Sequence, residues 1–247
     1  MDIYFAVLNF TLSGAIGLVG ILTLRKVSTP NEVVFALLPL LFALHQFTEG
    51  FVWLGVGGHI EKKAFDLAVG IFIYYAQGAL PFLVPLTVWL IEKVVWRKRI
   101  LGLLTLLGLG LAIYTMYGLS TIPSSVSVVN NTLYYNNPWT ANRYDAIIYI
   151  ITTCASLMLS SSISIALFGL LNLIGISIIF LLRPYGFTSL WCLYAAVISG
   201  LLYFHFVERR LKFLQDLKKK QNELSDELKK ELEALDKKRM ELIKKVE

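Results

Sequence analysis

The chain has 247 residues, of which 56% are hydrophobic and only 16% are charged, and its mean hydropathy is +0.65. A soluble globular domain carries about 25% charged residues, so this composition excludes a protein built only of water-soluble domains. The net charge of +6 does not indicate nucleic-acid binding, because no soluble basic domain is available to present a positively charged groove.

The charged residues are unevenly distributed. Residues 1–207 hold 10 Lys and Arg and 7 Asp and Glu, whereas residues 208–247 hold the other 13 and 10. We therefore predict two regions, a transmembrane bundle over residues 1–207 and a charged cytoplasmic helical tail over residues 208–247. The fold class is all-α, a polytopic helix bundle of about seven spans followed by a helix.

The hydrophobic segments define the spans. About 20 apolar residues are needed to cross a hydrocarbon core of about 30 Å. Only three serines separate the fifth segment from the sixth, so we expect a tight hairpin there. The first segment lacks the basic start of a signal peptide, and we interpret it as a retained span. The seven predicted spans are 3–24, 33–56, 65–91, 100–119, 144–161, 163–182 and 187–207.

The basic residues predict how the bundle is oriented, because loops that stay in the cytoplasm are richer in Lys and Arg. The side that holds the first loop, the third loop and the start of the tail carries Arg25, Lys26, Lys93, Arg97, Lys98, Arg99, Arg209, Arg210 and Lys212. The other side carries Lys62, Lys63 and Arg183. We expect a multi-pass protein of the cell membrane with its N-terminus outside and its C-terminus in the cytoplasm, which requires an odd number of spans.

The loop at about 120–143 is then external. It alternates β-branched and aromatic residues around Asn130 and Asn131, which favours a small β-hairpin over the mouth of the bundle. We interpret Tyr134, Tyr135 and Trp139 as part of the aromatic belt at the membrane interface.

The tail contains no Gly or Pro and is rich in Lys, Glu and Leu, so we expect a helix. Its leucines keep a 3-4 spacing that is interrupted near Leu232. A short coiled coil through residues 212–247 that makes a homo-oligomer is one interpretation. A single helix that lies on the anionic leaflet or extends into solvent is the other.

His45 and Glu49 in the second span give the sharpest chemical signal. They are four residues apart and therefore share one face of a helix. An ionisable side chain within a span is kept away from lipid and is usually paired, so we expect both to point into the bundle. Other spans carry polar and aromatic side chains at comparable depth. With these, the candidate ligand-binding residues are His45, Gln46, Glu49, Trp53, Tyr74, Tyr75, Gln77, Asn172, Trp191 and Tyr194, and Thr152 and Thr153 lie at similar depth.

The pair of His45 and Glu49 has a structural interpretation, as interhelical hydrogen bonding, beside a binding site and a catalytic centre. Two ligands on one helix do not make a metal site, since zinc needs three or four convergent groups. Cys154 and Cys192 fall in apolar stretches, where we interpret them as buried thiols. The chain lacks the GxSxG, HExxH and Walker signatures of common hydrolases and nucleotide-binding proteins, so an enzyme is not favoured and the cofactor stays unknown.

Three segments resemble a prokaryotic family of multi-span membrane proteins known only as a domain of unknown function. They are ALLPLLFALHQFTEGFVWLG, YYAQGALPFLVPLTVWLIEK and SLWCLYAAVISG. The resemblance covers about residues 33–205, and its most specific positions are Gln46, Glu49, Gly50, Trp53, Trp191, Cys192 and Tyr194. Members often begin with a Cys-Phe-Ser segment, whereas this chain begins MDIYFAVLN, and the charged tail lies beyond the family core. The resemblance implies the fold and draws attention to Glu49, and it implies no chemistry.

Our leading hypothesis is a membrane protein that binds or passes a small ligand, an ion or a proton at a polar pocket around His45 and Glu49. The lipid bilayer is its first partner. The alternatives are an intramembrane enzyme that acts on a lipid-like substrate and a non-catalytic receptor or scaffold that assembles through its tail.

Overall fold

The computed structural model describes residues 2–140, 143–183 and 186–243; the side chains of residues 143 and 236–243 are not described. It confirms the all-α fold, and the described strands form one two-stranded sheet. The chain divides into two compact units, residues 1–206 and residues 207–247, which are described separately below.

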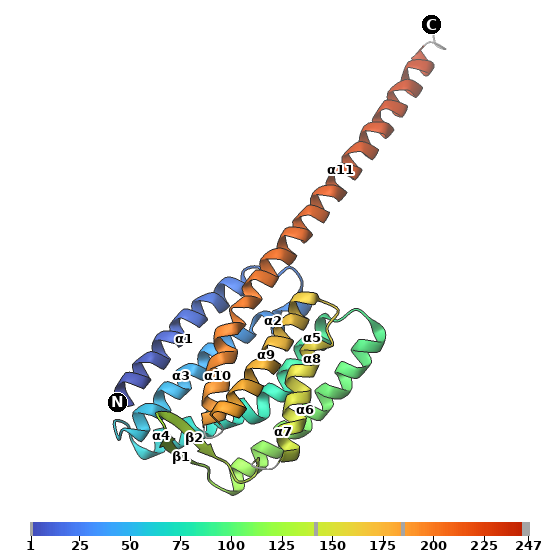
Figure 1. Cartoon of the computed structure of the whole chain (residues 1–247). Helices are drawn as coiled ribbons and strands as arrows, with labels where there is room; N and C mark the ends of the chain where they lie inside the picture. Colours follow the sequence, from blue (N-terminus) through green and yellow to red (C-terminus); the bar gives the residue numbers. More distant parts are fainter. Residues whose placement is uncertain (1, 141–142, 184–185, 244–247) are drawn as a thin grey trace. The chain divides into compact units, whose positions relative to one another are not determined.

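Most elements are α-helices; η1 is a 3-10 helix, and η2 and η3 are π-helices. In chain order the described elements are α1 (Asp2–Leu24), η1 (Pro30–Glu32), α2 (Val33–Ala36), α3 (Leu38–Val56), α4 (Lys62–Ile73), η2 (Tyr74–Ala79), α5 (Leu80–Ile91), α6 (Val95–Thr121), β1 (Ser125–Val129), β2 (Thr132–Asn136), α7 (Arg143–Ile150), η3 (Ile151–Ala155), α8 (Ser156–Met158), α9 (Ile163–Leu182), α10 (Phe187–Ser199) and α11 (Leu201–Ile243) (Figure 1).

Six helical stretches are long and apolar enough to cross a membrane, which indicates a membrane protein. They are Asp2–Leu24, Pro30–Val56, Lys62–Ile91, Val95–Thr121, Ile163–Leu182 and Phe187–Leu235. The fifth predicted span corresponds to a shorter apolar helix, Tyr144–Met158. At about 1.5 Å per residue it extends only about 22 Å, less than a full hydrocarbon core. The count of seven therefore stays a prediction.

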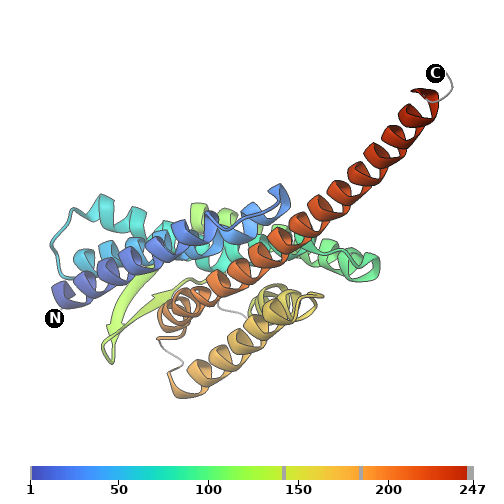
Figure 2. The same cartoon turned by 90° about the horizontal axis from the view of Figure 1, so that it is seen from above.

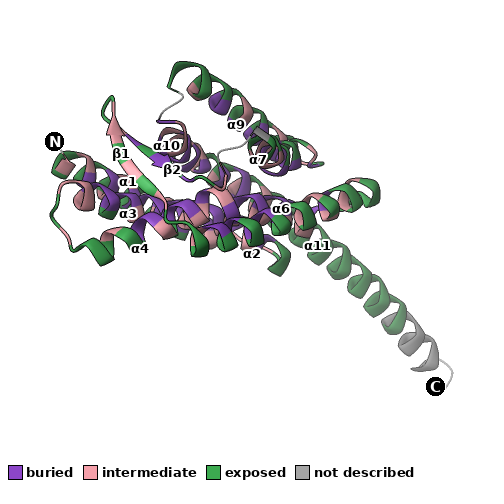
Figure 3. Ribbon diagram, turned by 90° about the horizontal axis from the view of Figure 1, so that it is seen from below, coloured by how far each residue is buried: buried purple, intermediate pink, exposed green. Residues whose placement is uncertain are grey.

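Helix packing buries the sides of the helices that face one another (Figure 3). α1 packs along α3, α5 packs along α6, and α10 lies between α3 and α9, which leaves α9 on an outer side of the bundle (Figure 2). Gly108 of α6 allows the closest approach, because a Cβ there would overlap the backbone of Pro81 and Phe82. Small residues at such crossings are typical of membrane helices, where close backbone contact replaces a hydrophobic driving force.

The π-helix η2 interrupts the third span just before a proline. Pro81 has no N–H group, so the carbonyl of Gln77, four residues earlier, lacks its normal helical donor. The Thr115 hydroxyl of α6 donates a hydrogen bond to this carbonyl (3.4 Å). A neighbouring helix thus satisfies a backbone group that lipid cannot, which is how broken helices are tolerated inside membranes.

The predicted β-hairpin is present. β1 pairs antiparallel with β2 from Ser125 opposite Asn136 to Val129 opposite Thr132. Asn130 and Asn131 form the turn with φ of 48° and 61°, the left-handed region that a two-residue hairpin turn requires and that Asn tolerates.

The position predicted for Tyr135 is wrong. β2 faces the bundle with Leu133 and Tyr135, which are 0% and 7% exposed, while Tyr134 between them is 36% exposed. Successive residues of a strand point to opposite faces, so only every second aromatic residue is free to meet an interface. Tyr135 packs into the protein core and does not belong to an interfacial belt.

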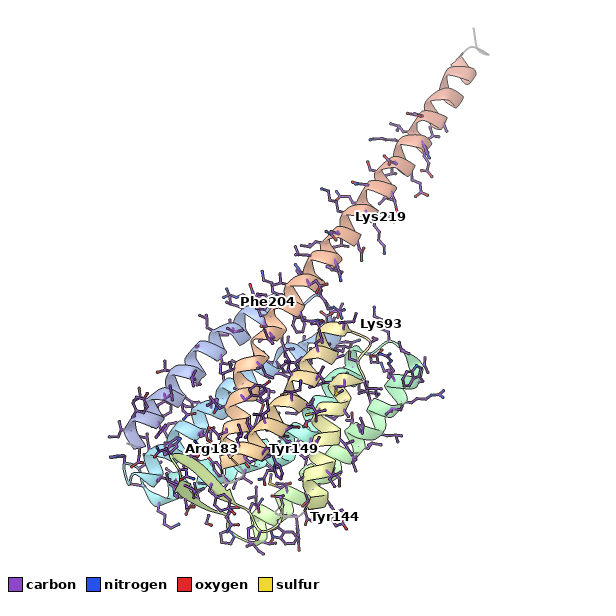
Figure 4. All side chains as sticks on the ribbon, viewed as in Figure 1. Lys93, Tyr144, Tyr149, Arg183, Phe204 and Lys219 are labelled. Carbon is purple, nitrogen blue, oxygen red and sulfur yellow. The ribbon has the colours of Figure 1, made fainter. Side chains whose placement is uncertain are left out.

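The two ends of the bundle are held by different contacts. Lys93 lies at the opposite end from Tyr144 and Arg183 (Figure 4). We call these the Glu92 end and the hairpin end. At the Glu92 end, the buried carboxylate of Glu92 accepts hydrogen bonds from the backbone N–H groups of Lys93 (2.9 Å), Val94 (2.8 Å) and Ser161 (2.7 Å). One side chain therefore joins the turn before α6 to the turn between α8 and α9, where the predicted tight hairpin lies.

In the unit formed by residues 207–247, α11 continues as a helix to Ile243. Leu214, Leu217, Leu224, Leu228, Leu232 and Leu235 are all at least 46% exposed in the single chain. The helix was predicted, whereas the coiled coil and the homo-oligomer stay predictions.

Glu92→Ala should destabilise the bundle, because it leaves three N–H donors without their acceptor; we expect a loss of about 2–4 kcal/mol in the free energy of unfolding. Burial alone raises the pKa of Glu92, but the N–H donors outweigh it and hold the pKa below its ordinary value of 4.5. The stabilisation is therefore complete above about pH 4.5 and disappears as the pH falls through the lower folded-state value.

Thermal unfolding of the purified protein at about pH 7 and about pH 3 measures both effects. The difference between wild type and Glu92→Ala should shrink at the lower pH, and an equal difference at both values would contradict the assignment. Glu61→Gln, which changes an exposed carboxylate, is the control.

Candidate functional site

Three polar side chains of α3 are fully enclosed by the bundle. His45, Gln46 and Glu49 are 2%, 0% and 1% exposed, which agrees with the inward direction predicted for His45 and Glu49. Among the described residues, no hydrogen-bond partner is found for either ring nitrogen of His45, either amide atom of Gln46, or Oε1 of Glu49. Buried polar atoms are paired in most proteins, so a group of unpaired ones calls for a functional or solvent-related explanation.

An aromatic column leads from this face of α3 toward the hairpin. The ring of His45 stacks on Phe72 (centroids 4.0 Å apart, 15°), and Phe72 stacks in turn on Tyr135 (4.4 Å, 14°). Tyr75 also packs against His45, with ring centroids 4.6 Å apart and the rings tilted by 34°. The second span, the third span and the hairpin therefore meet in one continuous stack.

The Glu49 carboxyl faces hydroxyl groups from two other elements. Ser189 of α10 and Tyr135 of β2 are both near enough to interact with it. The hydroxyl of Tyr135 nevertheless has no acceptor at ordinary hydrogen-bond distance within the described part of the chain. We call the group formed by His45, Gln46, Glu49, Tyr75 and Tyr135 the polar core.

A cavity of about 800 Å³ lies beside the polar core at the hairpin end. This volume is within the range of about 300–1,000 Å³ that is usual for small-molecule sites. Its polar lining residues are Gln77, Asn136, Asn137, Thr140, Asp145, Ser177 and Thr188. Its aromatic lining residues are Tyr134, Tyr135, Tyr149, Phe180, Phe187 and Trp191. Figure 4 shows Tyr149 within the bundle and Tyr144, five residues earlier on α7, at the end of the molecule.

Gln77 fixes the segment that closes this cavity. Its Oε1 accepts hydrogen bonds from the amide of Asn137 (2.9 Å) and from the hydroxyl of Thr140. Asn137 is 3% exposed, and Trp139 packs against Gly118 between two tyrosines of α6. The segment after β2 therefore descends into the bundle and is held there by the π-helix of the third span.

The sequence-predicted residues separate into groups. His45, Gln46, Glu49 and Tyr75 come together in the polar core, and Gln77 and Trp191 line the large cavity. None of the first four is on the wall of that cavity. The predicted pocket around His45 and Glu49 thus stays a prediction, and Tyr135 is the side chain common to the polar core and the cavity wall.

Other predicted residues lie elsewhere. Trp53 stacks on Phe5 and ties α3 to α1 (4.5 Å, 23°). Tyr74 packs over Gly78 within its own segment. The Tyr194 hydroxyl donates to the carbonyl of Leu171 and holds α10 against α9 (2.8 Å).

A second cavity, of only about 20 Å³, is separated from the first by Trp191, which lines both. Asn172 and Thr153 are among its lining residues. The hydroxyls of Thr152 and Thr153 donate to carbonyls of their own helix (2.8 and 2.7 Å), as does the Asn172 amide (2.8 Å). This space holds at most a single water molecule.

Comparison with known proteins gives one result. The model of a family of unknown function, DUF6629, matches residues 4–216. The chain belongs to this family. The match extends the resemblance seen in the sequence at both ends and includes the polar core, the cavity and the first residues of the tail. No curated protein and no solved structure matches the chain.

The groups available at the site of this DUF6629 member are mostly neutral. No group of three or more His, Cys, Asp or Glu side chains able to hold a metal ion occurs in the described part of the chain. Cys154 and Cys192 are buried thiols that form no disulfide. The cavity wall supplies amides, hydroxyls, aromatic rings and the carboxyl group of Asp145.

Sequence reasoning missed several residues of this DUF6629 site. Tyr135, Asn137 and Thr140 come from the loop, Phe72 comes from α4 and Tyr149 from α7. The alternating pattern of side chains along β2 could have predicted the position of Tyr135. Since Leu133 is apolar and two residues before Tyr135, a strand here must direct both to the same side.

Gln77→Leu should release the loop segment that closes the cavity. Two donors lose their acceptor, which costs about 1–3 kcal/mol for each buried group left unpaired. We expect amide hydrogen exchange over residues 132–140 to become about 10- to 100-fold faster, while exchange in α1 stays unchanged.

Thr105→Val is the matched control, because this α6 hydroxyl bonds only the carbonyl of Leu101 in its own helix. Unchanged exchange over the loop in Gln77→Leu would show that the two hydrogen bonds do not hold it.

Proposed function

We propose that this protein binds a small molecule inside the membrane, in the cavity of about 800 Å³ at the hairpin end. The observation that carries the proposal is the shared wall. Tyr135 lines the cavity, stacks on Phe72 and faces Glu49, so a ligand in the cavity lies one side chain away from a buried ionisable group. An ionisable residue inside a membrane bundle is a functional-site hypothesis by default, because placing it there is costly.

The polar core is then the part of the site that responds to the ligand. Movement of Tyr135 changes the surroundings of Glu49, whose Oε1 has no partner among the described residues. Uptake or release of a proton or a small cation at Glu49 follows from this, since a carboxylate buried without a cationic partner must be neutralised. In a second version of the proposal, the protein passes an ion or a proton across the membrane at this site.

The proposal includes an orientation and an assembly. The excess of Lys and Arg at the Glu92 end favours the cytoplasmic side of the membrane for that end, which would put the hairpin end and the cavity on the outer side. Residues 212–247 supply a helix with exposed leucines for a homo-oligomer. A lipid-directed enzyme is less well supported, because Ser177, Thr140 and Thr188 line the cavity but no described histidine does.

Ser177→Trp should prevent ligand binding, because the larger side chain on α9 would occupy the cavity. We expect the wild-type protein, extracted in native bilayer discs without detergent, to retain a small molecule at about one per chain, and Ser177→Trp to lose it at least tenfold. Mass spectrometry of the extracted small molecules measures the occupancy.

Ile178→Trp is the matched control, because it adds the same bulk one residue further along α9, at a side chain that is 50% exposed and not on the cavity wall. Identical sets of molecules from all three proteins would refute ligand binding at this cavity.

Glu49→Gln should make ligand binding in the cavity independent of pH. The amide keeps the size of the carboxyl but cannot change its charge, so we expect cavity occupancy to lose its pH dependence while the melting temperature stays close to that of wild type. Occupancy titrated over a range of pH in the same discs measures this. Asp66→Asn, at an exposed ion pair, is the control. An unaltered pH profile in Glu49→Gln would assign Glu49 to a structural role.

A further inference from the structure

The wall of the cavity continues onto the outer surface of the bundle. Ile147 of α7 and Phe180 and Leu181 of α9 line the cavity, yet they are 51%, 62% and 78% exposed. Within a membrane, apolar side chains on the outside of a helix lie against lipid chains. One and the same set of residues therefore borders both the cavity and the lipid.

Helix packing leaves room for an opening at this place. α9 packs along α8 and against η3, and α7 packs on η3 and α6, but no comparable packing joins α7 to α9 in the described residues. Near the Glu92 end α8 and η3 link the two helices, and toward the hairpin end no substantial packing between them is found in the described residues. Within the bundle of residues 1–206, α9 lies on an outer side (Figure 2).

The polar and charged groups on the cavity wall limit which ligands can bind there. Gln77, Asn137 and Thr140 present neutral amide and hydroxyl groups at one side of the cavity, and the α7–α9 side is apolar. Asp145 is the acidic lining residue, and none of the described lining residues is Lys or Arg. Among the described lining residues an anionic head group would find no cationic partner, which is unfavourable in a site of low dielectric constant.

From these three observations we infer that the ligand is an uncharged amphiphile with one apolar chain and a hydroxyl-bearing head, of the monoacylglycerol class, and that it enters from the lipid between α7 and α9. The inference rests on the proposed function and names its ligand class and route. The head group of the ligand lies near Gln77 and Asn137, and its apolar chain leaves along Phe180 and Leu181 into the leaflet at the hairpin end. An apolar chain longer than the cavity continues into lipid.

The test uses a monoacylglycerol that carries a photoreactive diazirine in its chain, reconstituted with the full-length protein in phosphatidylcholine vesicles. We expect cross-links on the lining residues of α7 and α9. An excess of unlabelled monooleoylglycerol should reduce them about tenfold, whereas oleate at the same mole fraction should not. Ser177→Trp should reduce them to a similar extent.

The route is tested separately by closing the opening. Leu181→Trp and, on the other helix, Ile147→Trp add bulk at the gap, and either one should slow the appearance of the cross-links about tenfold, whereas Ile178→Trp should not. Two positions on different helices keep the test valid if one variant does not fold. Wild-type rates in both gap variants would overturn lateral entry.

Three results decide against the ligand class. Cross-links spread over exposed positions of α1 and α9 and not reduced by unlabelled lipid show bulk contact only. Equal competition by oleate shows that the head group need not be neutral. If Ser177→Trp loses a co-purifying molecule while the monoacylglycerol never labels the cavity, ligand binding stands and this inference falls.

Discussion

A polar group inside a membrane bundle must find its partner within the chain, because lipid offers none and each unsatisfied group costs several kcal/mol. The described spans meet this constraint mostly locally: hydroxyls such as those of Thr48 and Thr105 donate to carbonyls one turn earlier in their own helices. Several side chains meet it over long range, among them Ser13, Thr115 and Tyr194, and Glu92 and Gln77 do so at the two ends of the bundle. Glu92 joins turns at one end of the bundle, and Gln77 holds the loop at the other.

Against this background the polar core stands apart. His45, Gln46 and Glu49 present five side-chain atoms for which no partner is found in the described residues, although all three are almost fully buried. Tyr75 and Tyr135 add two hydroxyls in the same condition. A sequence optimised for stability alone replaces such groups with apolar ones. Natural proteins depart from that rule at functional sites, which is why the polar core and the cavity beside it are interpreted together.

The sequence predicted the features that depend on local pattern. Hydropathy located six spans and the short apolar helix, and two consecutive asparagines located the hairpin turn. The four-residue spacing of His45 and Glu49 predicted their inward direction correctly. Depth within a span, by contrast, does not say which helices are neighbours. Trp53 shares the helix of Glu49 but packs on Phe5 of α1, and only the folded chain brings Tyr135 to Phe72.

The π-helices explain why the cavity lies where it does. η2 supplies Ala76 and Gln77 to the wall, and η3 begins directly after Ile150, which also lines it. A π-turn inserts one residue into a helix and rotates the side chains before it relative to those after it. Gln77 reaches the loop while Phe72, five residues earlier, remains in the stack with His45. In an unbroken α-helix of about 3.6 residues per turn, two side chains five residues apart point about 140° away from each other. The wider π-turn reduces this angle, so both contacts can be made from the inward side of the third span.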